Sequence, residues 1–279
     1  MFKKLQQFTA LILFALLFAA CRKDAAAKPK PVVAVNDIIE TQPAILTPVT
    51  TTLSDVIGGY YTGLPAHYNE TSKNYPLIIF IHGGGQVGDG KLDLPLVLND
   101  GVTQLLGAKL FPPNFKVNGK NFSFIVLAPQ FSQYPSNEQV AFFMDYAKQH
   151  FRVDTTRIYM TGLSMGGIVT SDMGAQYPHQ LAAIVPMSGV FGIEGSEYKC
   201  RSIAESNLPV WVFHNDHDPS LIPSGPRNFI SMINTFNPVI LPKLTMFSAA
   251  VHDAWTEALS PSYKENSMNI YEWMLHYTR

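Results

Sequence analysis

The pentapeptide Gly-Leu-Ser-Met-Gly at residues 162–166 follows an apolar, β-favouring run and precedes a run with helix-compatible spacing. A strand that turns sharply into a helix needs small residues on either side of the turn, because the backbone there is strained and tightly packed. The serine then projects above the sheet, at the positive end of the following helix, where developing negative charge is stabilised. The pattern therefore predicts Ser164 as a nucleophile. A chance combination of common turn residues is the alternative interpretation.

Strand-like and helix-like segments alternate on both sides of this turn. The strand-like runs lie at residues 75–81, 122–128, 158–163, 181–187, 209–213 and 243–248. The helix-like runs lie at residues 94–110 in part, 136–147, 165–177, 225–236 and 263–277. Such alternation predicts an α/β fold with a mostly parallel sheet covered by helices on both faces. A chain of 279 residues, 47% of them hydrophobic, can bury one core of this kind.

The first fifty residues are typical of an export and anchoring segment. Two lysines precede the apolar run 8–20, and two alanines stand directly before Cys21. The run is short for a membrane span. Its end resembles a bacterial lipobox, which predicts a signal peptide at residues 1–20, a lipid on Cys21 and an exported lipoprotein anchored on the periplasmic or cell-surface side. An ordinary cleaved signal peptide is the alternative.

Residues 21–52 are rich in Ala, Pro, Thr and Lys, which predicts a flexible tether before a catalytic domain at residues 53–279. The second cysteine, Cys200, is left without a partner and is predicted to be a buried thiol. The net charge is −1, and no basic tract follows the N-terminus, which argues against a nucleic-acid partner.

A glycine-rich segment, His-Gly-Gly-Gly at residues 82–85, ends the apolar run 75–81. Glycines at the end of a central strand let backbone N–H groups approach a ligand closely. In an esterase such groups form one side of an oxyanion hole, so we expect Gly84 or Gly85 to act with the N–H of Met165. A phosphate-binding loop and a simple turn are the alternatives, but no Gly-Lys-Ser/Thr and no G-x-G-x-x-G with a downstream ribose-binding acid accompanies the glycines, which argues against a nucleotide. We therefore predict no cofactor.

An acid and a base must follow the serine. A serine hydroxyl needs a base to take its proton, and the base needs a carboxylate to fix its tautomer. The order Ser, Asp, His at strand ends selects Asp218 and His252, with Asp216 as the rival acid. Pro219 biases Asp218 towards an extended or turn conformation on the loop that crosses the sheet.

Two further histidines, His214 and His217, come too early in the chain to be the base. The pair could indicate a metal, but no third ligand has a convincing spacing, so we predict no metal site.

Taken together, these motifs resemble the α/β-hydrolase superfamily over roughly residues 53–279, and more closely its secreted feruloyl esterases and poly(3-hydroxybutyrate) depolymerases. The resemblance is carried by residues 76–85, 162–167, 214–219 and 252–258. In those relatives a His-Gly-x-x-Asp segment ends in the triad acid and a His-Asp-x-Trp segment begins with the base, which implies Asp218 and His252. The chain departs from the pattern at Asn215 and Val251, where glycine is usual.

The resulting hypothesis is a serine hydrolase that cleaves carboxylic esters through an acyl-enzyme. Export suggests acylated polysaccharide or polyester-type substrates. Two alternatives remain open at this point: a serine exopeptidase of related fold, and a non-catalytic surface binding module on the same scaffold.

Overall fold

A computed structural model describes residues 38–192 and 196–279. The predicted signal peptide, Cys21 and the tether up to residue 37 lie outside these ranges. Within them, no helix has both the length and the apolarity needed to cross a bilayer.

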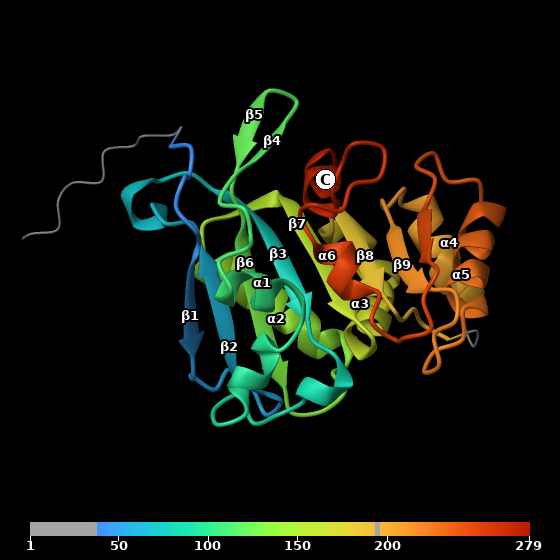
Figure 1. Ribbon diagram of the computed structural model, residues 1–279, viewed down its shortest axis with the longest axis horizontal. Helices are drawn as coiled ribbons and strands as arrows, with labels where there is room; N and C mark the ends of the chain where they lie inside the picture. The colour runs from blue at the N-terminus through green and yellow to red at the C-terminus, as the bar shows by residue number, and fades with distance from the viewer. Residues whose placement is uncertain (1–37, 193–195) are drawn as a thin grey trace, which may run out of the picture. The chain divides into compact units, whose positions relative to one another are not determined.

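A twisted sheet of eight strands forms the centre of the domain (Figure 1). Its order is β1-β2-β6-β3-β7-β8-β9-β10. The strands are β1 (Ile45–Val49), β2 (Ile57–Leu64), β3 (Tyr75–Ile81), β6 (Ile125–Phe131), β7 (Val153–Leu163), β8 (Ala183–Met187), β9 (Trp211–Asn215) and β10 (Lys243–Phe247). Pairing is antiparallel between β1 and β2 and between β2 and β6, and parallel from β6 to β10. The predicted mostly parallel sheet is therefore confirmed.

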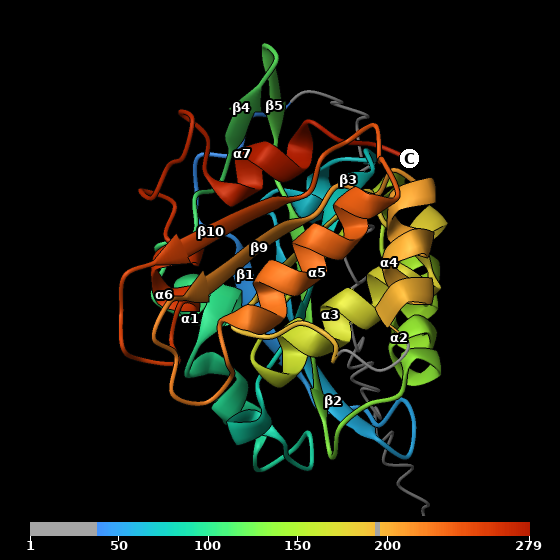
Figure 2. The same ribbon diagram turned by 90° about the vertical axis from the view of Figure 1, so that its right-hand side faces the viewer.

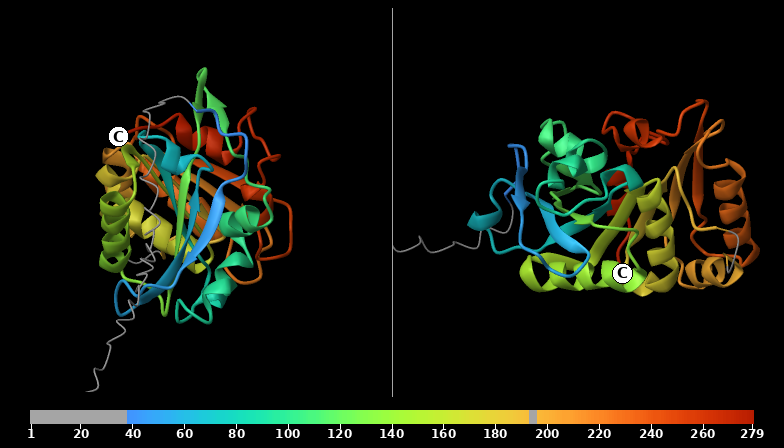
Figure 3. Two further views of the ribbon diagram at one scale, coloured as in Figure 1. Left: turned by 90° about the vertical axis from the view of Figure 1, so that its left-hand side faces the viewer. Right: turned by 90° about the horizontal axis from the view of Figure 1, so that it is seen from below.

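Helices cover both faces of this sheet (Figures 2 and 3). One face carries α2 (Asn137–His150), α3 (Met165–Gln176), α4 (Ser196–Glu205) and α5 (Ser224–Thr235). The other carries α1 (Gly101–Gly107), α6 (Trp255–Leu259) and α7 (Ile270–Leu275). Short 3₁₀ turns are η1 (Tyr68–Glu70), η2 (Gly84–Gln86), η3 (Leu94–Leu98) and η4 (Pro178–Gln180), and a small hairpin pairs β4 (Phe115–Val117) with β5 (Lys120–Phe122).

Strand β3 shows why the apolar runs could be read as central strands. All seven of its residues are buried, because β6 and β7 pair with it on either side and helices cover both of its faces. Parallel strands end at the same edge of a sheet. The loops after β3, β7, β8, β9 and β10 therefore gather at one edge, and every residue predicted for the triad or the oxyanion hole lies at the end of one of these strands or just beyond it.

The folded domain begins earlier than residue 53, contrary to the predicted tether boundary. Strand β1 lies inside the predicted tether and pairs antiparallel with β2, from Ile45 opposite Leu64 to Val49 opposite Tyr60. Further upstream, Glu40 is only 2% exposed and accepts hydrogen bonds from the backbone N–H and from Nδ1 of His67, the latter at 2.7 Å. Composition pointed to a tether because β1 is short, carries a proline and exposes most of its side chains.

The Glu40–His67 contact makes the stability of this segment depend on pH. We expect Glu40→Gln to lower the midpoint of thermal unfolding more at pH 6 than at pH 9. The hydrogen bond to Glu40 and its negative charge raise the pKa of His67. The pair therefore contributes stability below the unfolded histidine pKa of about 6.5, and the contribution is lost as the pH rises through the raised pKa. Calorimetric scans at both pH values measure the difference, and an equal loss at the two would contradict it.

Two helical segments differ from the sequence-based expectation. The closing helix is confined to α7, whereas a helix over residues 263–277 was expected. Positive φ values at Asn266 and Ser267 prevent a continuous helix there. The Asn269 side chain then accepts a hydrogen bond from the N–H of Glu272 and caps the N-terminus of α7. Helix α4 has no counterpart in the prediction. Cys200 lies on the buried side of α4, which confirms the prediction of a buried thiol. Burial raises the pKa of that thiol to about 12.

Candidate active site

The turn between β7 and α3 holds Ser164 in a conformation that few side chains adopt. Its backbone has φ 53° and ψ −116°, in the left-handed half of the map. Such conformations cost about 1–3 kcal/mol and persist where the surroundings impose them. The flanking glycines show how the surroundings impose this conformation on Ser164. A Cβ on Gly162 would lie 2.4 Å from the carbonyl oxygen of Gly166, and a Cβ on Gly166 would lie 2.0 Å from that of Ile81.

These distances make Gly166 a position where even one methyl group cannot fit. We expect Gly166→Ala to destabilise the domain by about 1–3 kcal/mol or more, because the obstructing atoms belong to the backbone and cannot rotate away. The midpoint of thermal unfolding should fall by several degrees. Gly225→Ala is the matched control, since a Cβ there meets no atom within 4 Å and alanine favours the α5 helix. Equal midpoints for the two variants would contradict the expectation.

The structure brings Ser164, His252 and Asp218 together from the ends of three different strands. The Ser164 hydroxyl lies 2.8 Å from Nε2 of His252, and Nδ1 of His252 lies 2.7 Å from Oδ2 of Asp218. A carboxylate can only accept, so Nδ1 carries the proton and Nε2 is free to accept from the hydroxyl. A hydroxyl, an imidazole and a carboxylate connected in this way can activate the hydroxyl as a nucleophile.

Asp218 is held ionised by its surroundings. Burial alone raises the pKa of a carboxyl group, but the hydrogen bond from His252 and the backbone N–H groups of Leu221 and Ser220 outweigh burial and lower the pKa of Asp218. The two N–H groups lie 3.1 and 2.7 Å from Oδ1, which leaves Oδ2 for the imidazole. A carboxylate fixed at both oxygens orients the imidazole rigidly.

Asp216, the rival acid, points elsewhere. Its Oδ1 accepts from Nδ1 of the exposed His217 at 2.7 Å and from the backbone N–H of Ala249 at 3.1 Å. Hydrogen bonding to His217 lowers the pKa of Asp216. These contacts join the loop after β9 to the loop after β10, so Asp216 braces the loop and does not contact His252.

The glycine-rich loop lies directly beside the serine turn. A Cβ on Gly83 would come 2.6 Å from Cδ1 of Leu163, the residue before Ser164. His82 connects the loop to strand β6: its Nδ1–H donates to the Gly83 carbonyl at 2.8 Å, and its Nε2 accepts from the N–H of Phe131 at 3.0 Å. Burial lowers the pKa of His82, which keeps the ring neutral and able to make both bonds.

The three predicted oxyanion donors begin two helical turns. Gly84 and Gly85 begin η2, and Met165 begins α3. The first N–H groups of a helical turn have no carbonyl partner within it. A Cβ on Gly84 or Gly85 would meet no atom within 4 Å, so the loop borders open space. These N–H groups are suited to receive negative charge from a bound ester.

A partly buried chain of polar contacts that the sequence did not reveal connects this loop to the histidine. Gln86 accepts from the Gly83 N–H at 2.7 Å and donates to Oδ2 of Asp100 at 3.1 Å. Oδ1 of Asp100 accepts from the indole N–H of Trp255 at 3.2 Å, and the Trp255 ring meets His252 edge to face with centroids 5.3 Å apart. None of these residue types marks such a chain in sequence, because its members are far apart.

Two more residues hold the histidine loop. Ser188, at the end of β8 with φ 48°, accepts from the N–H of Ala254 at 3.2 Å. Asn215 donates from its side chain to the carbonyl of Val251 at 2.8 Å. Asn215 and Val251 are the two positions at which the sequence departs from the motif pattern described above, and the structure shows that they contact each other.

Comparisons with known proteins support a carboxylic ester hydrolase. Residues 130–273 match the family described as phospholipase/carboxylesterase. A bifunctional acetylxylan esterase/xylanase of Neocallimastix patriciarum is 34% identical over 80 residues, which are 28% of this chain and 11% of that protein. A poly(3-hydroxyalkanoate) depolymerase C of Paucimonas lemoignei is 37% identical over 59 residues, which are 21% of this chain and 13% of that protein. The chain thus aligns with only about a tenth of the length of each curated relative.

Among solved structures, the fold is similar to that of a thermostable esterase, with a TM-score of 0.57 and 22% identity over 85% of this chain and 63% of the other. At that level of identity the likeness concerns the fold alone.

Proposed function

Because the chain belongs to the phospholipase/carboxylesterase family, we propose that it hydrolyses carboxylic esters through an acyl-enzyme formed on Ser164. The observation that carries the proposal is the hydrogen-bonded chain Ser164–His252–Asp218 at the ends of three neighbouring strands. The position of the glycine-rich loop beside Leu163, the residue before the serine, also supports the proposal.

The proposed reaction has two steps, acylation of Ser164 and hydrolysis of the acyl-enzyme. Ser164 Oγ attacks the ester carbonyl while Nε2 of His252 takes its proton, and Asp218 stabilises the imidazolium. The N–H groups of Met165 and of Gly84 or Gly85 receive the oxyanion. When the C–O bond of the ester breaks, His252 returns the proton to the leaving alcohol. Water, deprotonated by His252, then releases the acid and restores Ser164.

Labelling with a fluorophosphonate tests the proposal on the intact protein. An activated serine displaces fluoride and becomes phosphonylated, whereas an ordinary serine does not react. We expect a single adduct on the tryptic peptide that contains Ser164, and none after denaturation. Absence of labelling of the folded protein would favour the alternative of a non-catalytic binding module.

For the substrate class we propose acyl esters on polysaccharide or polyester-type esters. The named activities of the two curated relatives, on acetylxylan and on poly(3-hydroxyalkanoate), support this class. Acetylated xylan, a feruloylated sugar, poly(3-hydroxybutyrate) and an aminoacyl anilide should be compared at equal enzyme concentration. Turnover of the aminoacyl compound alone would overturn the ester assignment.

We also propose that the protein acts outside the cytoplasm, anchored through a lipid on Cys21. The lysines, apolar run and small residues before Cys21 support this location. Growth of expressing cells with an alkyne fatty acid should tag the protein, and Cys21→Ser should abolish the tag.

A further inference from the structure

The carboxylate of Asp100 is shared between two loops on which the proposed reaction depends. Its Oδ2 accepts from Nε2 of Gln86 at 3.1 Å, and its Oδ1 accepts from the indole N–H of Trp255 at 3.2 Å. Gln86 ends the 3₁₀ turn η2 of the glycine-rich loop, whereas Trp255 begins α6, just after the histidine loop. One side chain therefore connects the loop of the oxyanion donors to the loop of the base.

Asp100 does not use this carboxylate for its own helix. It stands directly before α1, where an aspartate ordinarily accepts from the first N–H groups of the helix, yet its side chain makes no such hydrogen bond. Its backbone is fixed by its neighbours. Gly101 has φ 79°, and a Cβ on it would lie 2.0 Å from Cζ of the buried Phe80 in β3. The Thr103 hydroxyl donates to the Asp100 carbonyl at 3.1 Å. Both carboxylate oxygens are thus left for contacts with other loops.

At one end, the contact reaches the predicted oxyanion donors. Oε1 of the buried Gln86 accepts from the N–H of Gly83 at 2.7 Å, and Gln86 closes the turn that contains Gly84 and Gly85. The amide of Gln86 cannot be flipped without loss, because its oxygen faces a donor and its nitrogen faces a carboxylate. Asp100 and Gly83 together therefore fix the orientation of this amide.

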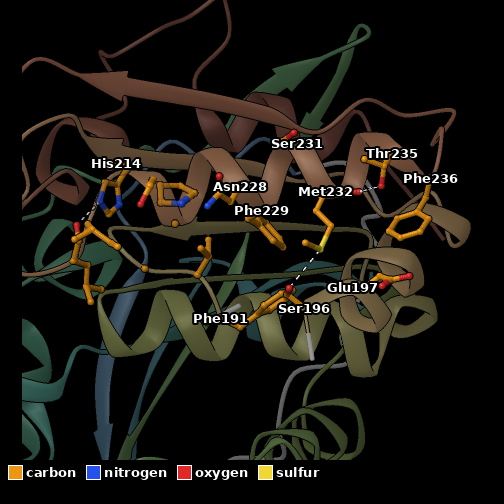
Figure 4. A pocket seen from close by; sticks show the side chains of 18 residues that line it. Phe191, Ser196, Glu197, His214, Asn228, Phe229, Ser231, Met232, Thr235 and Phe236 are labelled. Carbon is orange, nitrogen blue, oxygen red and sulfur yellow. Dashed lines mark hydrogen bonds between the residues drawn. The ribbon is translucent and has the colours of Figure 1, made fainter. Parts of the chain in front are cut away.

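At the other end, the contact reaches the imidazole. The Trp255 ring meets the ring of His252 edge to face, with centroids 5.3 Å apart and planes at 86°. Asp218 holds the same imidazole from the β9 side. There the N–H of Leu221 donates to Asp218, and the Leu221 carbonyl accepts from His214 at 2.9 Å, at one end of the cavity between α4 and α5 (Figure 4). Trp255 is thus a second support for the imidazole, on a different element from the acid.

We propose that Asp100 is a positioning residue, which sets the oxyanion donors relative to the imidazole by binding Gln86 and Trp255 at once. The inference rests on the proposed function. In acyl transfer the base and the oxyanion donors act on the same carbonyl group, so a small displacement of one relative to the other weakens transition-state stabilisation. Interactions that are made only in the transition state affect kcat and not KM.

Asp100→Asn tests the proposal, because it keeps the size of the side chain and leaves only one acceptor. Either Gln86 or Trp255 then faces an N–H group. We expect kcat for p-nitrophenyl acetate to fall about 10- to 100-fold, with KM within about two-fold of wild type. Asp145→Asn is the matched control, since it removes an exposed carboxylate from α2 and should leave kcat unchanged. A folded Asp100→Asn protein with wild-type kcat would overturn the proposal.

A compensating substitution separates positioning from a general structural effect. In the protein with both Gln86→Glu and Asp100→Asn, the carboxylate moves to position 86. One of its oxygens accepts from the Gly83 N–H and the other from the amide at position 100, whose own oxygen accepts from Trp255. All three hydrogen bonds return and the net charge is unchanged. We expect kcat within about three-fold of wild type, whereas Gln86→Glu alone sets two carboxylates face to face and should lose activity. A double variant no more active than Asp100→Asn would overturn the assignment, because the two losses would then be independent.

Fluorophosphonate labelling separates failure of this inference from failure of the proposed function. The rate of labelling of Ser164 should fall with kcat in both single variants and recover in the double variant. A wild-type protein that is not labelled would overturn the proposed function and this inference with it. A labelled wild type, with Asp100→Asn labelled at the same rate, would overturn this inference alone. If Asp100→Asn does not fold, Trp255→Phe takes its place, because it removes the Oδ1 contact and keeps a ring beside His252, and the same loss of kcat is expected.

Discussion

Ser164→Ala is expected to lower kcat for p-nitrophenyl acetate by about 10⁴-fold or more. The substitution removes the only atom of this side chain that can bond to the acyl carbon, and leaves His252 without a proton to accept. A loss of 10⁴ corresponds to about 5.5 kcal/mol of transition-state stabilisation. The fold should be unaffected, because alanine keeps the Cβ and the Ser164 hydroxyl hydrogen-bonds to His252 and not to a core residue.

The matched control is Ser262→Ala, which removes an exposed hydroxyl that contacts Ser260. It should keep wild-type kcat and unfold at the same temperature as wild type. A Ser164→Ala protein that is folded by circular dichroism and retains near-wild-type turnover would rule out Ser164 as the nucleophile.

Asp218→Asn is expected to lower kcat by about 10⁴-fold while the protein stays folded. An amide at this position can donate to Nδ1 of His252, which stabilises the tautomer with the proton on Nε2. That tautomer cannot accept a proton from Ser164, and the imidazolium that would form loses its counter-charge. Steady-state rates with p-nitrophenyl acetate at pH 7–8 measure the loss.

Asp216→Asn provides the contrast, because Asp216 lies two residues away and carries the same charge. Its contacts to His217 and Ala249 hold the loop and do not reach His252. We expect it to lower the unfolding midpoint and to change kcat by much less than Asp218→Asn. The reverse result, with Asp216→Asn inactive and Asp218→Asn at full activity, would exchange the two roles.

The parts of the fold that follow a strong local pattern were predictable. Strand β3 is buried on both faces and reads as an unbroken apolar run, and the turn around Ser164 needs its flanking glycines for steric reasons. The order Ser, Asp, His selects residues that the structure joins through His252, at 2.8 Å from Ser164 and 2.7 Å from Asp218. Periodicity and turn chemistry are properties of neighbouring residues, so they are visible in sequence.

The parts that depend on distant contacts were not predictable. Glu40 belongs to the folded domain because His67 hydrogen-bonds to it, and β1 because β2 offers a free edge. Both contacts depend on residues outside the segment 38–52, so the sequence of that segment alone does not predict them. The contact between Asn215 and Val251 is of the same kind: each residue alone is a departure from a glycine, and only the fold makes them partners.

The chain of contacts from Gln86 through Asp100 to Trp255 also bears on how such a site can be redesigned. The glycine-rich loop and the histidine loop are separated by about 170 positions in sequence, yet one carboxylate holds both, with one oxygen for each. If only one of the two loops is replaced by that of a relative, one oxygen of Asp100 keeps its partner and the other oxygen loses its partner. The two loops and residue 100 should therefore be replaced together. In libraries that vary only one loop, we expect most of the folded variants to retain Gln86 and Trp255.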